Sequence, residues 1–170
     1  MADAAVASGR VGGFKRAELA RLIALLLPVG LLGGAMASEY IGGLVPCEMC
    51  YWQRYPHAVA IVLAGLAFTG PAASSRSRAF ALLAALAIAI SGAIGVYHAG
   101  VELGVFEGLT TCSTTATGSG ADLLNEIMNA PLVRCDQIQF SFLGISMAGW
   151  NAILSLGGAL AIVLLNRKPR

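Results

Sequence analysis

Residues 79–100 read AFALLAALAIAISGAIGVYHAG, a run with no Asp, Glu, Lys or Arg and a single histidine, His98. About 20 helical residues cross the hydrocarbon core of a bilayer, so this run is long enough for one span. Residues 19–38 and 142–165 are similar, and residues 50–70 reach the same length when the polar turn before residue 58 is included. The pattern predicts an all-α integral membrane protein. We expect a single domain over residues 1–170, an antiparallel four-helix bundle with one larger outer loop at residues 101–141.

Composition and charge support this prediction and give an orientation. Of the 170 residues, 57% are hydrophobic and 12% charged, which excludes an ordinary soluble globule. Nine of the eleven Lys and Arg residues fall on one side if the helices alternate in direction: Arg10, Lys15, Arg16, Arg21, Arg76, Arg78, Arg167, Lys168 and Arg170. By the positive-inside rule that side is cytoplasmic, so both termini are predicted to be cytoplasmic. The net charge of +2 therefore reports topology and not nucleic acid binding.

The start of the chain has two interpretations. Residues 22–32, followed by Ala35, Met36 and Ala37, are similar to a signal peptide with a small-residue cleavage site. The apolar run is longer than a usual signal core, which favours an uncleaved first helix. Cleavage after Ala37 would leave the orientation of the remaining helices unchanged.

The four cysteines all fall on the predicted outer side, in a compartment that permits stable disulfides. Cys47 and Cys50 form a Cys-x-x-Cys pair at the start of the second helix. Cys112 and Cys135 both lie in the outer loop, and Cys112 lies within a stretch rich in Thr, Ser and Gly. Four cysteines allow three pairings, of which pairing within each loop is the simplest.

Cys50 is placed to become a thiolate, the form of cysteine that attacks a disulfide. It lies in the first turn of a helix, where free N–H groups and the positive end of the helix dipole favour an anion. Arg54 follows four residues later, and positions 47, 50 and 54 share one helical face. Arg54 has a structural alternative, in which its charge reaches the outer headgroups without a chemical role. Beside a Cys-x-x-Cys pair we favour the functional role, and His98 joins the candidate site because it closes its helix at a similar depth.

Two other uses of the cysteines compete with redox chemistry. A structural zinc site normally shows two close pairs of ligands, whereas 22 residues separate Cys112 from Cys135, so we predict no metal ligands. A non-enzymatic membrane scaffold stapled by disulfides is the second alternative, and it leaves Arg54 unexplained.

The chain resembles the DsbB family, bacterial membrane proteins that reoxidise a periplasmic thiol oxidase by using quinone. The resemblance is carried by four spans, by Cys47-x-x-Cys50 with Arg54 four residues on, by two loop cysteines and by the stretch CDQIQFSFLGISM at residues 135–147. It implies a disulfide-generating thiol:quinone oxidoreductase of the bacterial inner membrane. It also implies a DsbA-like periplasmic partner, and ubiquinone or menaquinone as the cofactor.

The resemblance further implies an order of electron entry. A reduced partner attacks a Cys112–Cys135 disulfide and becomes bonded to Cys112. Cys135 is then released and attacks Cys47, which frees Cys50 as a thiolate.

For the exit of electrons, the resemblance implies that Cys50 reacts with a bound quinone while Arg54 polarises a quinone oxygen. His98 and Met147 match positions near the quinone of the family. A vitamin K epoxide reductase-like quinone reductase is an alternative with a similar bundle. In those proteins the Cys-x-x-Cys that meets the quinone lies near the last helix, whereas here it opens the second, which argues against that alternative.

Overall fold

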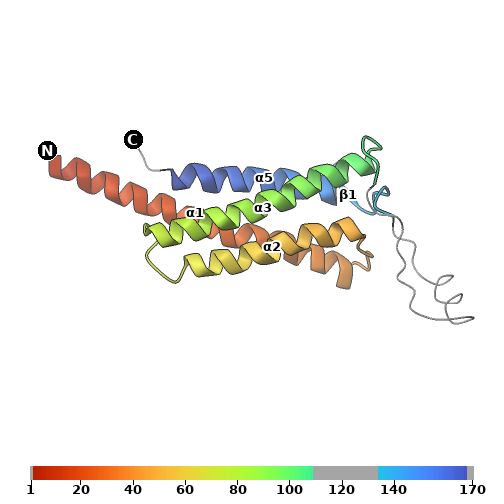
Figure 1. Ribbon diagram of the computed structural model, residues 1–170, viewed down its shortest axis with the longest axis horizontal. Helices are drawn as coiled ribbons and strands as arrows, with labels where there is room; N and C mark the ends of the chain where they lie inside the picture. Colours follow the sequence, from red (N-terminus) through yellow and green to blue (C-terminus); the bar gives the residue numbers. More distant parts are fainter. Residues whose placement is uncertain (1, 109–133, 168–170) are drawn as a thin grey trace, which may run out of the picture.

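The computed structural model describes residues 2–108 and 134–167, with side chains described from residue 15 onward. Over these residues the chain forms four helices that run along the long axis of the molecule (Figure 1): α1 (Ala2–Tyr40), α2 (Glu48–Ala67), α3 (Ser75–Glu102) and α5 (Met147–Asn166). Successive helices run in opposite directions, so the two chain ends lie at the same end of the bundle (Figure 1). The predicted antiparallel four-helix bundle is therefore confirmed.

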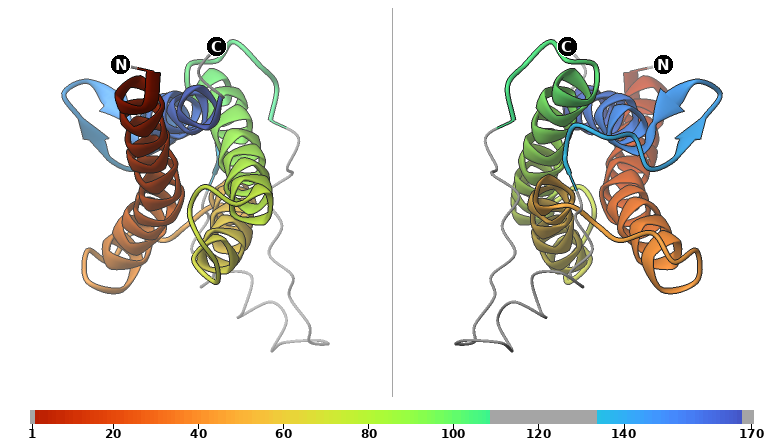
Figure 2. Two further views of the ribbon diagram at one scale, coloured as in Figure 1. Left: turned by 90° about the vertical axis from the view of Figure 1, so that its left-hand side faces the viewer. Right: turned by 90° about the vertical axis from the view of Figure 1, so that its right-hand side faces the viewer.

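Small side chains allow the helices to pack closely. Helix α3 packs against α2 and α5, and α1 packs against the same two helices, an arrangement seen end-on in Figure 2. Alanines dominate the buried core, with Ile88 and Ile162 among its larger members. A Cβ atom added at Gly95 of α3 would lie 3.0 Å from the carbonyl oxygen of Ala148 in α5. Such close backbone approach is typical of helix packing in membranes, where small residues line the interfaces.

Three of the helices in the described part of the chain are long and apolar enough to cross a membrane: Lys15–Tyr40, Ser75–Glu102 and Met147–Asn166. Helix α2 is more polar because it carries Gln53, Arg54 and His57. Gln53 and His57 are buried against the other helices. The bundle interior therefore receives polar groups that lipid would not solvate.

The segment before α5 forms a hairpin, which differs from the start of the last predicted span. Strands β1 (Ser141–Phe142) and β2 (Ile145–Ser146) pair antiparallel, and α5 begins only at Met147. Leu143 and Gly144 form the turn with φ values of 54° and 77°, the left-handed conformation of a tight two-residue hairpin. The Ser146 side chain then accepts a hydrogen bond from the backbone N–H of Gly149, which caps α5.

Candidate functional site

Cys47 and Cys50 lie at the start of α2, where Cys47 is the residue that caps the helix. The Cys47 sulfur accepts a hydrogen bond from the backbone N–H of Cys50 at 3.3 Å. The two sulfur atoms are 2.9 Å apart. Cys47 is buried and Cys50 is half-buried. The sequence placed both thiols on one helical face, and the structure holds them in contact.

The two thiols differ in their surroundings. The side-chain hydrogen bond with Cys50 and burial raise the pKa of the Cys47 thiol. The raised pKa favours Cys47 as the protonated partner in this pair. The same difference favours Cys50, in the first turn of α2, as the position of a negative charge on the reduced pair, and the helix dipole acts in the same direction.

Two residues from distant parts of the chain meet Cys47. His98, near the end of α3, places its Nε2 atom 3.6 Å from the Cys47 sulfur. Cys135, which is also buried, belongs to the segment that leads toward the hairpin. The ligating atoms of Cys47, His98 and Cys135 all lie within 4.8 Å of one another. Cys112 lies outside the described residues.

Arg54 is held by helix α1. Its Nη1 atom forms an ion pair with the Glu39 carboxylate, and its Nη2 atom donates to the carbonyl oxygen of Ala35 at 3.2 Å. The guanidinium also lies over the Tyr51 ring, 5.1 Å from the ring centre. The sequence predicted that Arg54 lies near Cys50, whereas its hydrogen bonds are with residues of α1. This ion pair joins two helices, so the spacing of residues along α2 alone could not predict it.

A cavity of about 610 Å³ connects these groups. Its wall includes five of the predicted site residues: Cys47, Cys50, Arg54, His98 and Met147. Glycines and leucines of α1 form another part of the wall, and Phe140, Phe142 and Trp150 contribute aromatic rings. The cavity is therefore suited to a flat and mostly apolar molecule that meets a thiol and a guanidinium.

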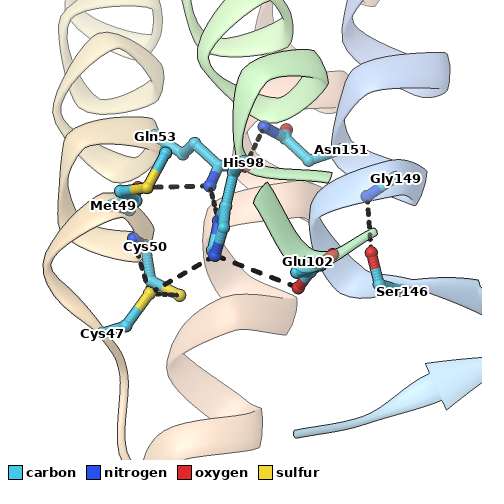
Figure 3. A network of polar contacts seen from close by, with 9 residues as sticks. All are labelled: Cys47, Met49, Cys50, Gln53, His98, Glu102, Ser146, Gly149 and Asn151. Atoms are coloured by element: carbon cyan, nitrogen blue, oxygen red, sulfur yellow. Dashed lines mark hydrogen bonds and ion pairs between the residues drawn. The ribbon is translucent and has the colours of Figure 1, made fainter. Parts of the chain in front are cut away.

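Sequence reasoning missed a buried polar network behind the two thiols (Figure 3). Gln53 of α2 contacts His98 of α3, and Asn151 of α5 donates to the Gln53 side-chain oxygen at 2.8 Å. The side chain of Glu102, one turn beyond His98, is 7% exposed, and its Oε1 atom lies 3.9 Å from His98 Nε2. His57, one turn further along α2 than Gln53, hydrogen-bonds to Asn151 at 2.9 Å. The available signal was the presence of polar side chains in apolar helices, which is costly in a membrane unless they are paired.

Comparison with known proteins adds independent information. The family model described as "Disulfide bond formation protein DsbB" matches residues 17–165. "Disulfide bond formation protein B" of Xanthomonas oryzae pv. oryzae (strain MAFF 311018) is 29% identical over 160 residues, which cover 88% of this chain and 90% of the relative. The protein of the same description from Chromohalobacter salexigens is 29% identical over 167 residues, covering 86% and 92%. "Uncharacterized protein RP370" of Rickettsia prowazekii is 23% identical over 145 residues, covering 83% of each chain. No solved structure matches.

Proposed function

Because this chain belongs to the DsbB family of membrane oxidoreductases that generate disulfide bonds, we propose that it passes electrons from a reduced periplasmic dithiol protein to a membrane quinone. An enzyme of this family is neither a disulfide-stapled scaffold nor a vitamin K epoxide reductase-like protein. The net reaction converts one partner dithiol and one quinone into one partner disulfide and one quinol.

Electrons enter through Cys112 and Cys135. A thiolate of the partner attacks the Cys112 sulfur of a Cys112–Cys135 disulfide, and Cys135 leaves as a thiolate. The second thiol of the partner then displaces Cys112, and the partner departs as a disulfide. The DsbA-like partner is a thioredoxin-like periplasmic protein in this proposal.

The next transfer joins the two cysteine pairs. The Cys135 thiolate attacks the Cys47 sulfur of a Cys47–Cys50 disulfide, and Cys50 leaves as a thiolate. The short distance between the Cys47 and Cys135 sulfurs, at most 4.8 Å, is the observation that carries the proposal. Cys112 then attacks Cys135, which restores the outer disulfide and leaves Cys47 and Cys50 reduced.

Electrons leave through the cavity beside Cys50. The residues there fit a quinone, because Arg54 offers guanidinium N–H donors to a carbonyl oxygen while the surrounding wall is mainly apolar. A quinone bound in this cavity accepts two electrons and two protons. Arg54, His98 and Met147 would hold it, and the thiolate of Cys50 faces the same space. Cys47 supplies one proton as the Cys47–Cys50 disulfide re-forms.

The location follows from the same proposal. We place the protein in the bacterial inner membrane, with both termini cytoplasmic and all four cysteines on the periplasmic side. The distribution of Lys and Arg supports this orientation.

The test uses the full chain purified in detergent, a reduced thioredoxin-like partner and a short-chain quinone, with quinone absorbance as the readout. Cys112→Ser is expected to block entry of electrons, and Cys50→Ser to block their exit. In Cys112→Ser, Cys135 can still attack the Cys47–Cys50 disulfide and no Cys112 thiol is present to release Cys47, so a Cys47–Cys135 disulfide with a free Cys50 thiol should accumulate, which mass spectrometry of the non-reduced protein detects. Arg54→Ala is expected to slow quinone reduction roughly tenfold or more while the fold persists, because a charged hydrogen bond is lost. Undiminished quinone reduction by Cys50→Ser would refute the proposal.

A further inference from the structure

We propose that Gln53 is a positioning residue that fixes the tautomer of His98, so that the ring presents its Nε2 proton to the Cys47 sulfur (Figure 3). This inference rests on the role proposed above for Cys47 and extends it to a residue outside the redox relay. Gln53 is 7% exposed and His98 is 3% exposed, so water does not compete for these contacts.

The orientation of the Gln53 amide follows from its backbone contact. Its Nε2 atom donates to the carbonyl oxygen of Met49 at 3.1 Å, and a carbonyl oxygen only accepts. The same nitrogen lies 2.8 Å from Nδ1 of His98. The amide group therefore donates to His98, and Nδ1 of His98 accepts.

A contact from α5 fixes the other end of the amide. The Gln53 side-chain oxygen accepts from Nδ2 of Asn151 at 2.8 Å. The Asn151 orientation is set in turn, because its Nδ2 atom lies 3.2 Å from the backbone carbonyl oxygen of Ser91. Rotating the Gln53 amide by half a turn would lose the contacts with both Met49 and Asn151.

The position of the histidine proton follows. A neutral imidazole carries one N–H, and Nδ1 is occupied as an acceptor, so the proton lies on Nε2. Nε2 is 3.6 Å from the Cys47 sulfur and 3.9 Å from Oε1 of Glu102. The ring also hydrogen-bonds to the backbone of Cys135, so the Nε2 proton lies between the two cysteines that exchange, where negative charge develops on sulfur.

The same arrangement makes this cluster a poor metal site. Cys47, His98 and Cys135 have the proximity of three ligands. A histidine ligand, however, binds metal through a lone pair and donates its other N–H to a neighbour. Gln53 presents a donor at Nδ1, which leaves no lone pair at Nε2. Cys47 and Cys135 therefore remain free of metal and can exchange disulfide bonds with each other.

Gln53→Glu tests the inference, because a carboxylate of the same shape only accepts and draws the ring proton to Nδ1. The chain has two histidines, so ¹⁵N-histidine labelling in detergent gives signals from two rings, and a His98→Gln sample assigns them. We expect His98 protonated at Nε2 in the wild type and at Nδ1 in Gln53→Glu. Gln53→Met, which removes the donor without adding an acceptor, should give a mixture of tautomers.

Cobalt(II) titration of the reduced protein is the second readout. Gln53→Glu is expected to bind Co²⁺ at least tenfold more tightly than the wild type, with thiolate-to-metal absorption. Gln139→Glu is the matched control. Gln139 lines the same cavity from the outer segment, and its substitution by Glu adds the same charge as Gln53→Glu. It should leave both the tautomer and the Co²⁺ affinity as in the wild type.

Three outcomes would overturn the inference: a wild-type ring protonated at Nδ1, an unchanged tautomer in Gln53→Glu, or equal Co²⁺ binding by Gln53→Glu and Gln139→Glu. These readouts need no turnover, so they are separate from the proposed electron route. A wild type that reduces no quinone but shows the expected tautomer would refute the route alone. If the tautomer is reversed, exchange between Cys135 and Cys47 should slow about tenfold, as expected for one lost hydrogen bond to a charged atom.

Discussion

Arg54 shows how a residue on one helix can take its direct hydrogen-bond partners from a neighbouring helix. Its guanidinium lines the cavity with Cys50, but its ion pair is with Glu39 of the preceding helix. The two side chains are 13% and 19% exposed, so the pair is largely withdrawn from solvent. An ion pair in such surroundings orients the cation, and its removal leaves a charge that the bundle does not solvate.

The first prediction concerns this pair. Glu39→Gln should destabilise the bundle by about 2 kcal/mol, because Arg54 would remain without its carboxylate. Adding Arg54→Met to Glu39→Gln should restore part of that loss, since both charges are then absent. Unfolding in mixed micelles, followed by circular dichroism, measures the stability of the wild type, Glu39→Gln, Arg54→Met and the double variant, which together form a double-mutant cycle. Strictly additive effects of the two substitutions would show that the ion pair contributes nothing.

The second prediction concerns the two thiols. The pKa of Cys47 is raised by its hydrogen bond with Cys50 and by burial, so at a given pH Cys47 holds less thiolate than an ordinary cysteine. Iodoacetamide reacts with the thiolate. It should therefore modify Cys50 first at neutral pH, and Cys47 only well above the ordinary thiol range of about 8.5.

Peptide mass spectrometry after brief modification of the reduced protein reports the order of reaction. The unfolded protein is the control, in which the two cysteines should react at similar rates. Faster modification of Cys47 in the folded protein would contradict the assignment of the charge to Cys50.

At the scale of helices, the contact between α3 and α5 decides where His98 lies relative to Asn151. Two glycines of α3, Gly92 and Gly95, allow the two helices to approach this closely. A Cβ at Gly92 would come within 2.9 Å of the Leu156 side chain, and one at Gly95 would meet the backbone of α5 at 3.0 Å. Backbone cannot move aside as a side-chain tip can, so Gly95 is the stricter position.

The third prediction follows from this difference. Gly95→Ala should lower the free energy of unfolding by about 1–3 kcal/mol, because α3 and α5 must separate. Gly157→Ala is the matched control within α5, since no atom lies within 4 Å of a Cβ added there. It should be neutral, or stabilising by up to about 1 kcal/mol through helix propensity. Equal loss in both variants, measured by thermal unfolding in detergent, would contradict the close contact.

The helices also show what one sequence can and cannot predict. The long apolar runs were sufficient for the bundle, because crossing a bilayer is a demand that each helix meets alone. Cys47, Cys50 and Arg54 were found because they are neighbours on one helix. Gln53 and Asn151 were missed, because their partnership depends on how α2 and α5 are rotated about their axes, which hydropathy does not specify. The start of α5 was also placed too early, since Phe142 continues the apolar run but lies in the hairpin.

At the scale of the whole molecule, the bundle has two chemically different ends. The termini and the connection between α2 and α3 lie at one end, and the two thiols lie at the other with the hairpin (Figure 1). Arg54 and Arg134 line the cavity. The other Lys and Arg residues belong to the sequence segments that lead to the first end. An orientation that places this end in the cytoplasm is expected from the positive-inside rule.

The fourth prediction tests that orientation in a variant whose four cysteines are replaced by alanine. Glu107→Cys in this background should react in intact spheroplasts with a maleimide that does not cross membranes, because residue 107 is exposed beyond α3. Ala73→Cys, exposed in the connection between α2 and α3, should react only after the cells are opened. The reverse pattern would place the cysteines in the cytoplasm.

One sulfur atom belongs to two kinds of structure at once. Cys47 closes the first turn of α2 through the amide of Cys50, and the same atom changes its covalent partner in the proposed electron route. Each turnover would then alter one of the two acceptors of that amide, because the carbonyl oxygen of Cys47 keeps its own contact with the same N–H at 3.1 Å. Deuterium uptake at the Cys50 amide should therefore differ between the oxidised and the reduced protein, so that a single amide reports the redox state of the pair.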